Sequence, residues 1–111
     1  MEAAASNLAD LPWVSVVRGE VAAVLASSEA LPVDLVVLDP PRVGAGRAVV
    51  DAVVDRGPRA VAYVACDPAA LARDVATFSS RGYAVSSLRA FDLFPQTHHV
   101  ECVAILSPVA G

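Results

Sequence analysis

Short apolar runs alternate with segments of helical spacing along the chain. The apolar runs are rich in valine and leucine, as buried strands are. The predicted strands are residues 13–17, 34–38, 60–65, 83–88 and 100–106. The predicted helices are residues 21–28, 48–56 and 68–81, and residues 1–10 resemble the end of another helix. Strands that alternate with helices at this spacing predict an α/β fold with a mostly parallel sheet and flanking helices.

The length and composition limit the class of protein. The 111 residues correspond to one small domain or to part of a larger one. Apolar residues make up 56% of the chain, but no apolar run reaches the roughly 18 residues that span a bilayer, so we predict no membrane partner. The first residues lack the basic and apolar segments of a signal peptide. We therefore expect a cytoplasmic protein whose two cysteines are free thiols.

The charge pattern argues against one mode of nucleic-acid binding. The formal net charge is −4, and all eight cationic side chains are arginines. An acidic chain does not hold nucleic acid by bulk electrostatic attraction. An RNA partner would need local arginines or another domain to supply that attraction.

The turn after residues 60–65 carries the first candidate for chemistry, Cys66. An apolar strand stops at Cys66, and Asp67-Pro68 then opens an alanine-rich helix. Ligands of open α/β folds bind at the carboxyl ends of strands, where this turn would lie. The amino end of the following helix favours the thiolate, which is the nucleophilic form. The alternative is that Cys66 is a buried apolar filler, as free cysteines usually are.

A second turn, Asp39-Pro40-Pro41-Arg42, follows the strand at residues 34–38. Each proline fixes φ and removes an amide donor, so this turn is rigid and suited to hold the Asp39 carboxylate against a ligand. The alternative is a local hydrogen bond of Asp39 within an ordinary loop. Gly44-Ala45-Gly46 lacks the third glycine of a dinucleotide fingerprint, so we predict a flexible loop there.

The third stretch is FDLFPQTHHVE, residues 91–101. Adjacent strand residues point to opposite faces, so His98 and His99 are poorly placed to share an ion, and we predict no metal site. Glu101 heads an otherwise apolar strand, and a carboxylate entering a core needs a reason. Glu101 is therefore either functional or a strand-edge residue that faces water.

These stretches together resemble one family. DPPR at 39–42, YVACDPAALARD at 63–74 and FDLFPQTHHVE at 91–101, in this order, are similar to motifs of the RNA uracil-5-methyltransferases. The resemblance implies an enzyme that uses S-adenosylmethionine to methylate C5 of a uridine in tRNA or rRNA. This chain has Ala65 and Asp67 where the family often has serine or threonine before the cysteine and asparagine after it.

The resemblance also assigns roles to individual residues. It implies that Cys66 is the catalytic nucleophile and Glu101 the general base. Asp39 matches the aspartate at the cofactor and target-base site, and Glu20 matches a polar residue that contacts the cofactor. Arg42 and Phe94 are further candidates for holding the target uracil, although Phe94 also fits a role in core packing.

The resemblance covers about residues 7–106 and implies only part of a catalytic domain. The family's glycine-rich cofactor loop, the acidic residue after the second strand and the RNA-binding region have no counterpart in these residues. We therefore expect residues 1–111 to form the carboxyl-terminal part of a Rossmann-like methyltransferase domain without its first strands, inactive by itself. The strand at 34–38 would then have an open edge, which favours self-association.

Two other functions remain open. Amino-group methyltransferases also carry a D-P-P turn, normally followed by an aromatic residue where this chain has Arg42, and they need no cysteine. The chain could instead be a non-catalytic remnant that pairs with another subunit. The sequence does not specify which RNA or which uridine is the target.

Overall fold

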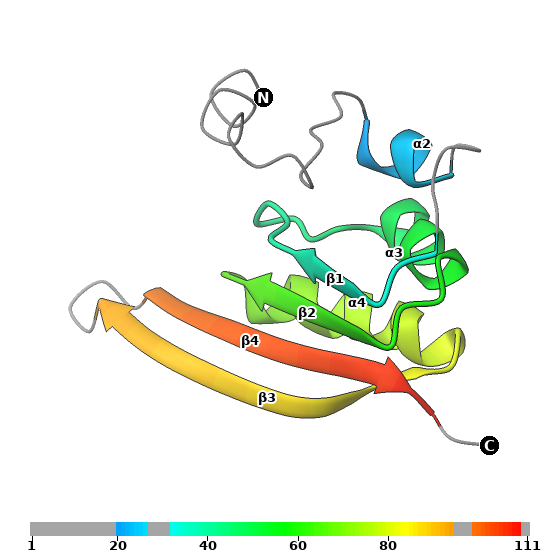
Figure 1. The fold of residues 1–111 in the computed structure, drawn as a ribbon. Coiled ribbons are helices and arrows are strands. Elements are labelled where there is room, and N and C mark those ends of the chain that lie inside the picture. Colours follow the sequence, from blue (N-terminus) through cyan, green and yellow to red (C-terminus); the bar gives the residue numbers. More distant parts are fainter. Residues whose placement is uncertain (1–19, 27–31, 95–98, 110–111) are drawn as a thin grey trace, which may run out of the picture.

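The computed structural model describes residues 20–26, 32–94 and 99–109, which form a four-stranded sheet and three helices (Figure 1). The strands are β1 (Leu35–Leu38), β2 (Ala60–Ala65), β3 (Tyr83–Phe94) and β4 (His99–Pro108). The helices are α2 (Val21–Ala26), α3 (Arg47–Asp55) and α4 (Pro68–Ser80). The predicted α/β fold is confirmed, but the sheet is mixed rather than mostly parallel, because β4 follows β3 in a hairpin and pairs antiparallel with both of its neighbours. The bounds of β2 are those that the sequence predicted. The predicted helix at 1–10 and strand at 13–17 lie outside the described residues.

The sheet has the order β1-β2-β4-β3. β1 and β2 pair in parallel, whereas β4 is antiparallel to both of its neighbours, β2 and β3. Three of the four strands therefore share one direction, and only β4 runs against them. Because β4 is reversed, its amino end lies at the same edge of the sheet as the carboxyl ends of β1 and β2.

β3 is longer than the sequence predicted. The alternating pattern ended at Leu88, but the strand continues to Phe94 as one arm of a long hairpin with β4. Phe91 pairs with Glu101, and Phe94 pairs with His99. Backbone pairing with β4 therefore extends the strand beyond the segment that side-chain alternation identifies.

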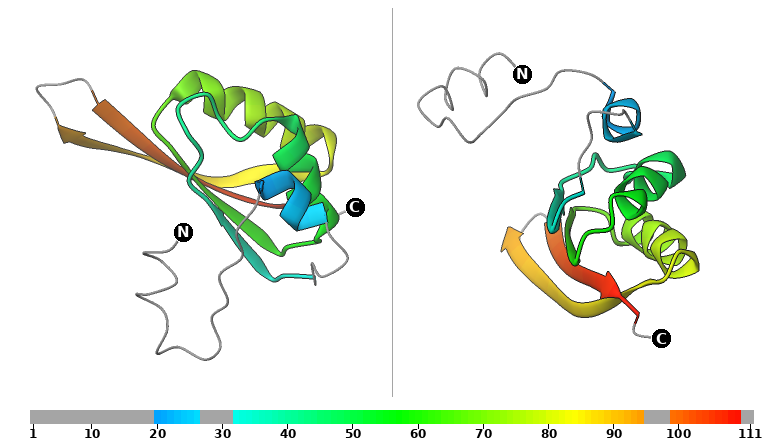
Figure 2. Two further views of the ribbon diagram at one scale, coloured as in Figure 1. Left: turned by 90° about the horizontal axis from the view of Figure 1, so that it is seen from above. Right: turned by 45° about the vertical axis from the view of Figure 1, so that its right-hand side comes forward.

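Helices α3 and α4 cover one face of the sheet (Figures 1 and 2). Alternate residues of β2 face these helices, and Val61 and Tyr63 are almost completely buried. Phe78 of α4 is fully buried and packs against Tyr83 with a ring-centroid distance of 6.3 Å. Burying a side chain of this size contributes about 1.5–3 kcal/mol, so this layer forms the core.

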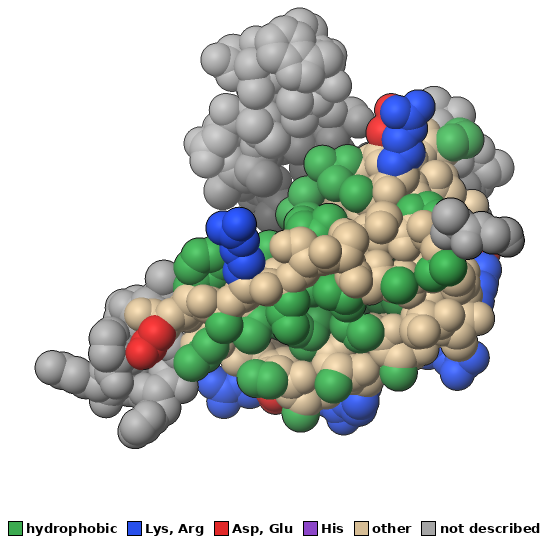
Figure 3. All heavy atoms as spheres, turned by 90° about the horizontal axis from the view of Figure 1, so that it is seen from below, with side chains coloured by type: hydrophobic (Ala, Val, Ile, Leu, Met, Phe, Trp, Pro, Cys, Tyr) green, Lys and Arg blue, Asp and Glu red, His purple; other side chains and the backbone are tan. Residues whose placement is uncertain are grey.

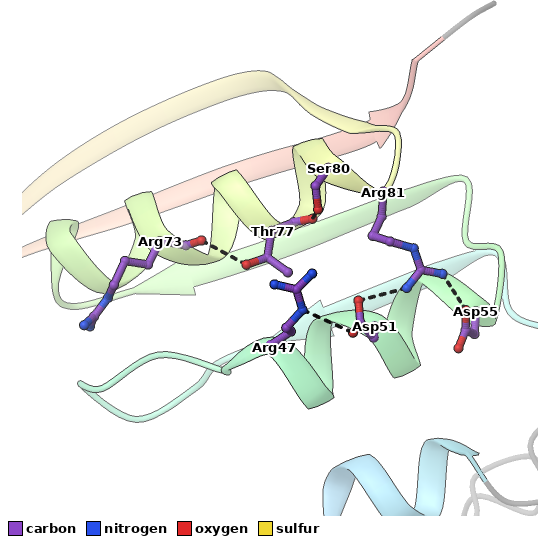
Figure 4. Close-up of polar contacts among 7 residues, drawn as sticks. All are labelled: Arg47, Asp51, Asp55, Arg73, Thr77, Ser80 and Arg81. Atoms are coloured by element: carbon purple, nitrogen blue, oxygen red, sulfur yellow. Dashed lines mark hydrogen bonds and ion pairs between the residues drawn. The ribbon is translucent and has the colours of Figure 1, made fainter.

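An arginine at the end of α4 links the two helices (Figure 4). The Arg81 guanidinium donates to Asp51 at 2.8 Å and to Asp55 at 2.6 Å, and both carboxylates belong to α3. Gly82 follows with a φ of 85°, the left-handed conformation that ends helices, as the sequence predicted. These contacts fix α3 and α4 side by side on the sheet.

The opposite face of the sheet carries exposed apolar side chains. Leu35 and Val37 of β1 alternate with core-facing residues and are 59% and 64% exposed. Phe91 of β3, which pairs with Glu101, is also exposed on this face. Figure 3 shows apolar side chains gathered on the side of the molecule where β3 lies in Figure 1. β1 is at the edge of the sheet within the described part, so self-association through that edge remains a prediction.

Candidate functional site

The candidate residues Asp39 and Cys66 follow neighbouring parallel strands. Leu38, the last residue of β1, pairs with Tyr63 of β2, so the two strands end at the same edge of the sheet. Asp39 comes directly after β1, and Cys66 comes directly after β2. Both side chains are exposed. The fold therefore brings the two predicted turns together at the edge where open α/β folds bind ligands.

Glu101 reaches this edge from the reversed strand. Ala65 pairs with Cys102 in the antiparallel register of β2 and β4, and continuing that register by one residue places Cys66 opposite Glu101. Opposite residues of antiparallel strands have Cα atoms about 4.5–5.5 Å apart. Glu101 is half-buried, and β4 lies between two other strands. Glu101 is therefore not on an edge strand, and its direct partner Phe91 is exposed, so its role as a base stays a prediction.

The two cysteines have different environments. Cys102 is 9% exposed and belongs to the core, whereas Cys66 is exposed. Cys102 is the apolar filler, and Cys66 is not. Asp67 accepts a hydrogen bond from the Ala69 amide at 2.9 Å, and Pro68 is the first residue of α4. This capped helix start, as the sequence predicted, directs its amino end to the turn that carries the thiol.

A cleft of about 380 Å³ lies beside the turn at residues 39–42. Asp39 is the one charged residue that lines it, and the other lining residues are apolar or glycine. The lining residues are Val21, Val37, Leu38, Asp39, Pro40, Pro41, Gly44, Ala45 and Val49. A cleft of this size with few polar groups is typical of a small-molecule site. Glu20 directly precedes Val21, which is the first residue of α2 and lines the cleft.

Two further predicted site residues, Arg42 and Phe94, lie on a loop and at a strand end. Arg42 is exposed on the loop after Pro41 and does not line the cleft. Phe94 ends the β3 backbone, while its side chain and residues 95–98 lie outside the described part of the structure. Among the described residues, no group of three or more histidine, cysteine or acidic side chains is placed to hold a metal ion.

The sequence analysis missed Asp74, a buried carboxylate beneath the loop after Arg42. Asp74 is 5% exposed on the core-facing side of α4. It accepts hydrogen bonds from the Ala45 amide at 2.7 Å, from the Gly46 amide at 3.2 Å and from the Tyr63 hydroxyl. The loop that was predicted to be flexible is therefore anchored. A charged residue on the apolar stripe that includes Ala70 and Phe78 was the available signal.

Tyr63 is held in its protonated form by these surroundings. Burial raises the pKa of Tyr63 above its ordinary value, and the hydrogen bond to the Asp74 carboxylate raises it further. The phenol is therefore a hydrogen-bond donor to Asp74 across the physiological pH range. Because Tyr63 is three residues before Cys66 in β2, this bond ties α4 to the strand that leads to the thiol.

The raised pKa of Tyr63 predicts a loss of stability at alkaline pH. The folded state keeps the proton more tightly than the unfolded chain, so the contribution is complete below about pH 10 and decreases as the pH rises above it. Urea unfolding measured from pH 8 to 11 checks this. The Tyr63→Phe variant should lose less stability above pH 10 than the original chain. Tyr83, whose pKa burial also raises, contributes equally in both. Identical pH dependence of the two proteins would contradict the prediction.

Gly44 is required by its close approach to Asp74. A Cβ on Gly44 would lie 2.8 Å from Oδ2 of Asp74 and 3.2 Å from Cβ of Ala70, at a φ of +92°. We expect Gly44→Ala to lower the free energy of unfolding by about 2–4 kcal/mol, through backbone strain and the clash together. Gly46→Ala is the matched control, because Gly46 has a φ of +85° and no atom within 4 Å of its added Cβ. It should cost about 1–2 kcal/mol. Equal losses in urea unfolding would show that the clash is relieved.

Comparison with known proteins decides the family. The family described as tRNA (Uracil-5-)-methyltransferase matches residues 27–109. The chain belongs to this family. That match contains the Asp39 turn, the Cys66 turn and Glu101, which the sequence analysis identified as the motifs of the resemblance.

Relatives of this tRNA (uracil-5-)-methyltransferase family member agree with the assignment. An uncharacterized RNA methyltransferase of Streptomyces avermitilis is 58% identical over 99% of the chain, and one of Streptomyces coelicolor is 56% identical over 99%. The chain spans only 25% and 24% of the length of these two relatives. It therefore corresponds to about a quarter of each.

Solved structures support the same family and fold. The tRNA (uracil-54, C5)-methyltransferase of Pyrococcus abyssi, solved with S-adenosyl-L-homocysteine, is 40% identical and has a TM-score of 0.59; the match covers 66% of this chain and 18% of that one. A putative RNA methyltransferase of Pyrococcus horikoshii has a TM-score of 0.71 over 98% of this chain and 58% of its own. Its 16% identity shows a shared fold alone. The Rossmann-like methyltransferase fold predicted from the sequence is confirmed.

Proposed function

We propose that the protein carrying this chain transfers a methyl group from S-adenosylmethionine to C5 of a uridine in tRNA or rRNA. The observation that carries the proposal is the register of β2 and β4: its last pair is Ala65 with Cys102, and the next residues at that end are Cys66 and Glu101, at the sheet edge where Asp39 also lies. A nucleophile and a base at the same end of two neighbouring strands are the two groups that this reaction needs. Membership of the tRNA (uracil-5-)-methyltransferase family supports the same assignment.

Cys66 provides the nucleophile in the proposed mechanism. Uracil C5 is a poor nucleophile, and a thiolate that adds to C6 converts the ring into an enolate whose C5 is electron-rich. The thiol is exposed at the amino end of α4, so a uracil ring can reach it. It is also close to the partial positive charge of that helix end. Cys66 therefore forms the covalent bond that activates the ring.

Glu101 provides the base that completes the reaction. Once C5 carries the methyl group, its hydrogen must leave as a proton before the Cys66–C6 bond can break. A half-buried carboxylate opposite the cysteine is positioned to take this proton. The electrons of the C5–H bond then re-form the ring double bond, and the thiolate leaves.

The cleft beside Asp39 fits part of the family's cofactor. It is lined by Asp39 and otherwise by apolar residues and glycine, and it has a volume of about 380 Å³. Asp39 would accept hydrogen bonds from polar groups of S-adenosylmethionine, and Glu20, which directly precedes the cleft residue Val21, is the second candidate. When bound, the cofactor supplies an electrophilic methyl sulfonium. We propose that segments outside these residues hold the rest of it.

RNA is the proposed partner, and its target base must leave the stack to reach Cys66. Arg42 is exposed next to the cleft and is a candidate for holding the base or its phosphate. A uracil-binding role for Phe94 stays a prediction. With a net charge of −4, we propose that most of the RNA affinity comes from regions outside this chain. A cytoplasmic location also stays a prediction; in the described residues no helix is long and apolar enough to cross a membrane.

We further propose that residues 1–111 are the carboxyl-terminal part of a class I methyltransferase domain and are inactive alone. Support comes from the share of the Streptomyces avermitilis relative that the chain matches, 25% of its length. Among the described residues, the exposed apolar face and the position of β1 at the sheet edge are consistent with a sheet that continues beyond them.

A chimera tests the proposed function. This chain replaces the matching quarter of the Streptomyces avermitilis relative, and methyl transfer from labelled S-adenosylmethionine to a uridine-containing RNA transcript pool is measured. We expect 5-methyluridine in the digested RNA from the chimera and none from the chain alone. A methylated base other than 5-methyluridine, or no methylation of any RNA, would contradict the proposal.

A further inference from the structure

The buried carboxylate of Asp74 connects three segments that carry the candidate site. It belongs to α4, the helix that follows Cys66. Through the Tyr63 hydroxyl it is bonded to β2, the strand that precedes Cys66. Through the amides of Ala45 and Gly46 it is bonded to the loop that follows the Asp39 turn. The two amide bonds of Asp74 thus join the Cys66 side of the site to the Asp39 side, and the Tyr63 bond joins the two elements that flank Cys66.

We propose that Asp74 is a positioning residue that holds the Asp39 loop at a fixed place relative to the Cys66 turn. The inference rests on the proposed function for its catalytic consequence and on geometry alone for the anchoring itself. Asp74 touches neither substrate nor cofactor in this account. Its effect reaches the reaction through the loop, because misplacing a binding group by about 1 Å can reduce turnover by roughly a hundredfold.

The chemistry of the position argues against a purely structural role. The other buried residues of α4 are Ala70, Leu71 and Phe78, and an apolar residue at position 74 would continue that stripe. Burying a carboxylate is costly unless hydrogen bonds compensate it. No salt bridge joins Asp74 to a cation in the part of the chain that the structure describes, so two loop amides and one phenol provide the compensation.

The loop is also shaped to approach this carboxylate. Gly44 leaves no room for a side chain next to Asp74, and Gly46 has a φ of +85° at the start of α3. Gly46 is the N-cap residue of α3 and makes no side-chain capping bond. Its amide donates a hydrogen bond to the Asp74 carboxylate. A carboxylate from α4 therefore accepts from the two residues that directly precede α3, which is how it fixes the loop between β1 and α3.

Asp74→Asn tests the anchor, because an amide cannot accept from all three donors. Oδ2 receives Tyr63 and Ala45, and Oδ1 receives Gly46. Whichever oxygen becomes NH₂, one loop amide faces a donor and loses its bond. Tyr63→Phe is the matched control: it removes one of the three donors from the same carboxylate but leaves both loop amides bonded.

The experiment measures two quantities in each variant of the chimera after far-ultraviolet circular dichroism has shown that it is folded. The first is hydrogen exchange of the Ala45 and Gly46 amides, relative to amides of β2. The second is kcat and KM for RNA methylation well below the melting temperature. We expect Asp74→Asn to speed hydrogen exchange of the two loop amides by about tenfold or more and to lower kcat by about tenfold or more. Tyr63→Phe should change each quantity by less than about threefold, at a similar loss of stability.

Three results would overturn the inference. Loop exchange unchanged in Asp74→Asn would remove the anchor. Equal losses of kcat in the two variants, following their stability, would make Asp74 a structural residue only. If Asp74→Asn does not fold, Asp74→Glu replaces it, since the extra methylene displaces both acceptor oxygens. Unchanged loop exchange and unchanged kcat in Asp74→Glu would contradict the inference equally. If the unsubstituted chimera transfers no methyl group, the proposed function fails, while loop exchange still decides whether Asp74 anchors the loop.

Discussion

Replacing Cys66 with alanine abolishes methyl transfer in the chimera if the proposed mechanism is correct. Without the thiolate, nothing adds to C6 and C5 stays a poor nucleophile, so we expect turnover to fall by roughly four orders of magnitude or more. The variant should fold normally, because Cys66 is exposed and contributes nothing to the core. The measurement is the initial rate of 5-methyluridine formation at saturating RNA and cofactor.

Cys102→Ala is the matched control for this loss. Cys102 is 9% exposed and lies in the core of β4, one residue from Glu101. Its truncation removes one sulfur from the core, so we expect a lower melting temperature with methylation retained. Amino-group methyltransferases need no cysteine nucleophile. Full activity in Cys66→Ala would therefore favour that class and contradict the proposed mechanism.

Replacing Glu101 with glutamine is expected to trap the reaction after methylation. The amide cannot remove the C5 proton, so the ring cannot regain its double bond and Cys66 cannot leave. Turnover should fall by about 10²–10⁴-fold. A protein–RNA complex that survives denaturing electrophoresis should accumulate with unmodified uridine RNA, and it should carry the labelled methyl group. In this respect Glu101→Gln differs from Cys66→Ala, which should form no complex.

The control for Glu101 is Asp92→Asn on the neighbouring strand. Asp92 is exposed and follows Phe91, the residue of β3 that pairs with Glu101. The substitution removes one negative charge close to the site without touching the proposed base, so we expect near-normal turnover and no accumulated complex. Loss of activity in both variants would assign the effect to local charge. Normal turnover in Glu101→Gln would exclude Glu101 as the base.

Local sequence patterns predicted much of the fold. The valine-rich runs located β1 and β2, and Asp67-Pro68 and Gly82 marked the start and end of α4. These signals are local because capping and turn residues act within a few positions. The predicted end of β3 at residue 88 was wrong, because the signals for its last residues are not local. Its last residues are ordered by pairing with β4, and single-strand periodicity does not record such pairing.

The candidate site was predictable only in part. Local reasoning placed Asp39 and Cys66 after strands, whereas Glu101 is 35 positions from Cys66 in the sequence and meets it only because β4 runs against β2. No periodicity specifies that reversal, and the pairing of the two roles came from the family resemblance. The anchor at Asp74 was missed because its partners are backbone amides 28 and 29 positions away. Side-chain patterns carry no information about such donors.

The most direct test of the central claim is to map a covalent adduct. RNA containing 5-fluorouridine is incubated with the chimera and S-adenosylmethionine. Fluorine at C5 cannot leave as a cation, so a Cys66–C6 bond that forms cannot be released after methylation. Digestion and mass spectrometry should locate the methylated fluorouridine on Cys66, with none on Cys102. No adduct, in a chimera that methylates ordinary RNA, or an adduct on another residue, would contradict the assignment of Cys66 as the nucleophile.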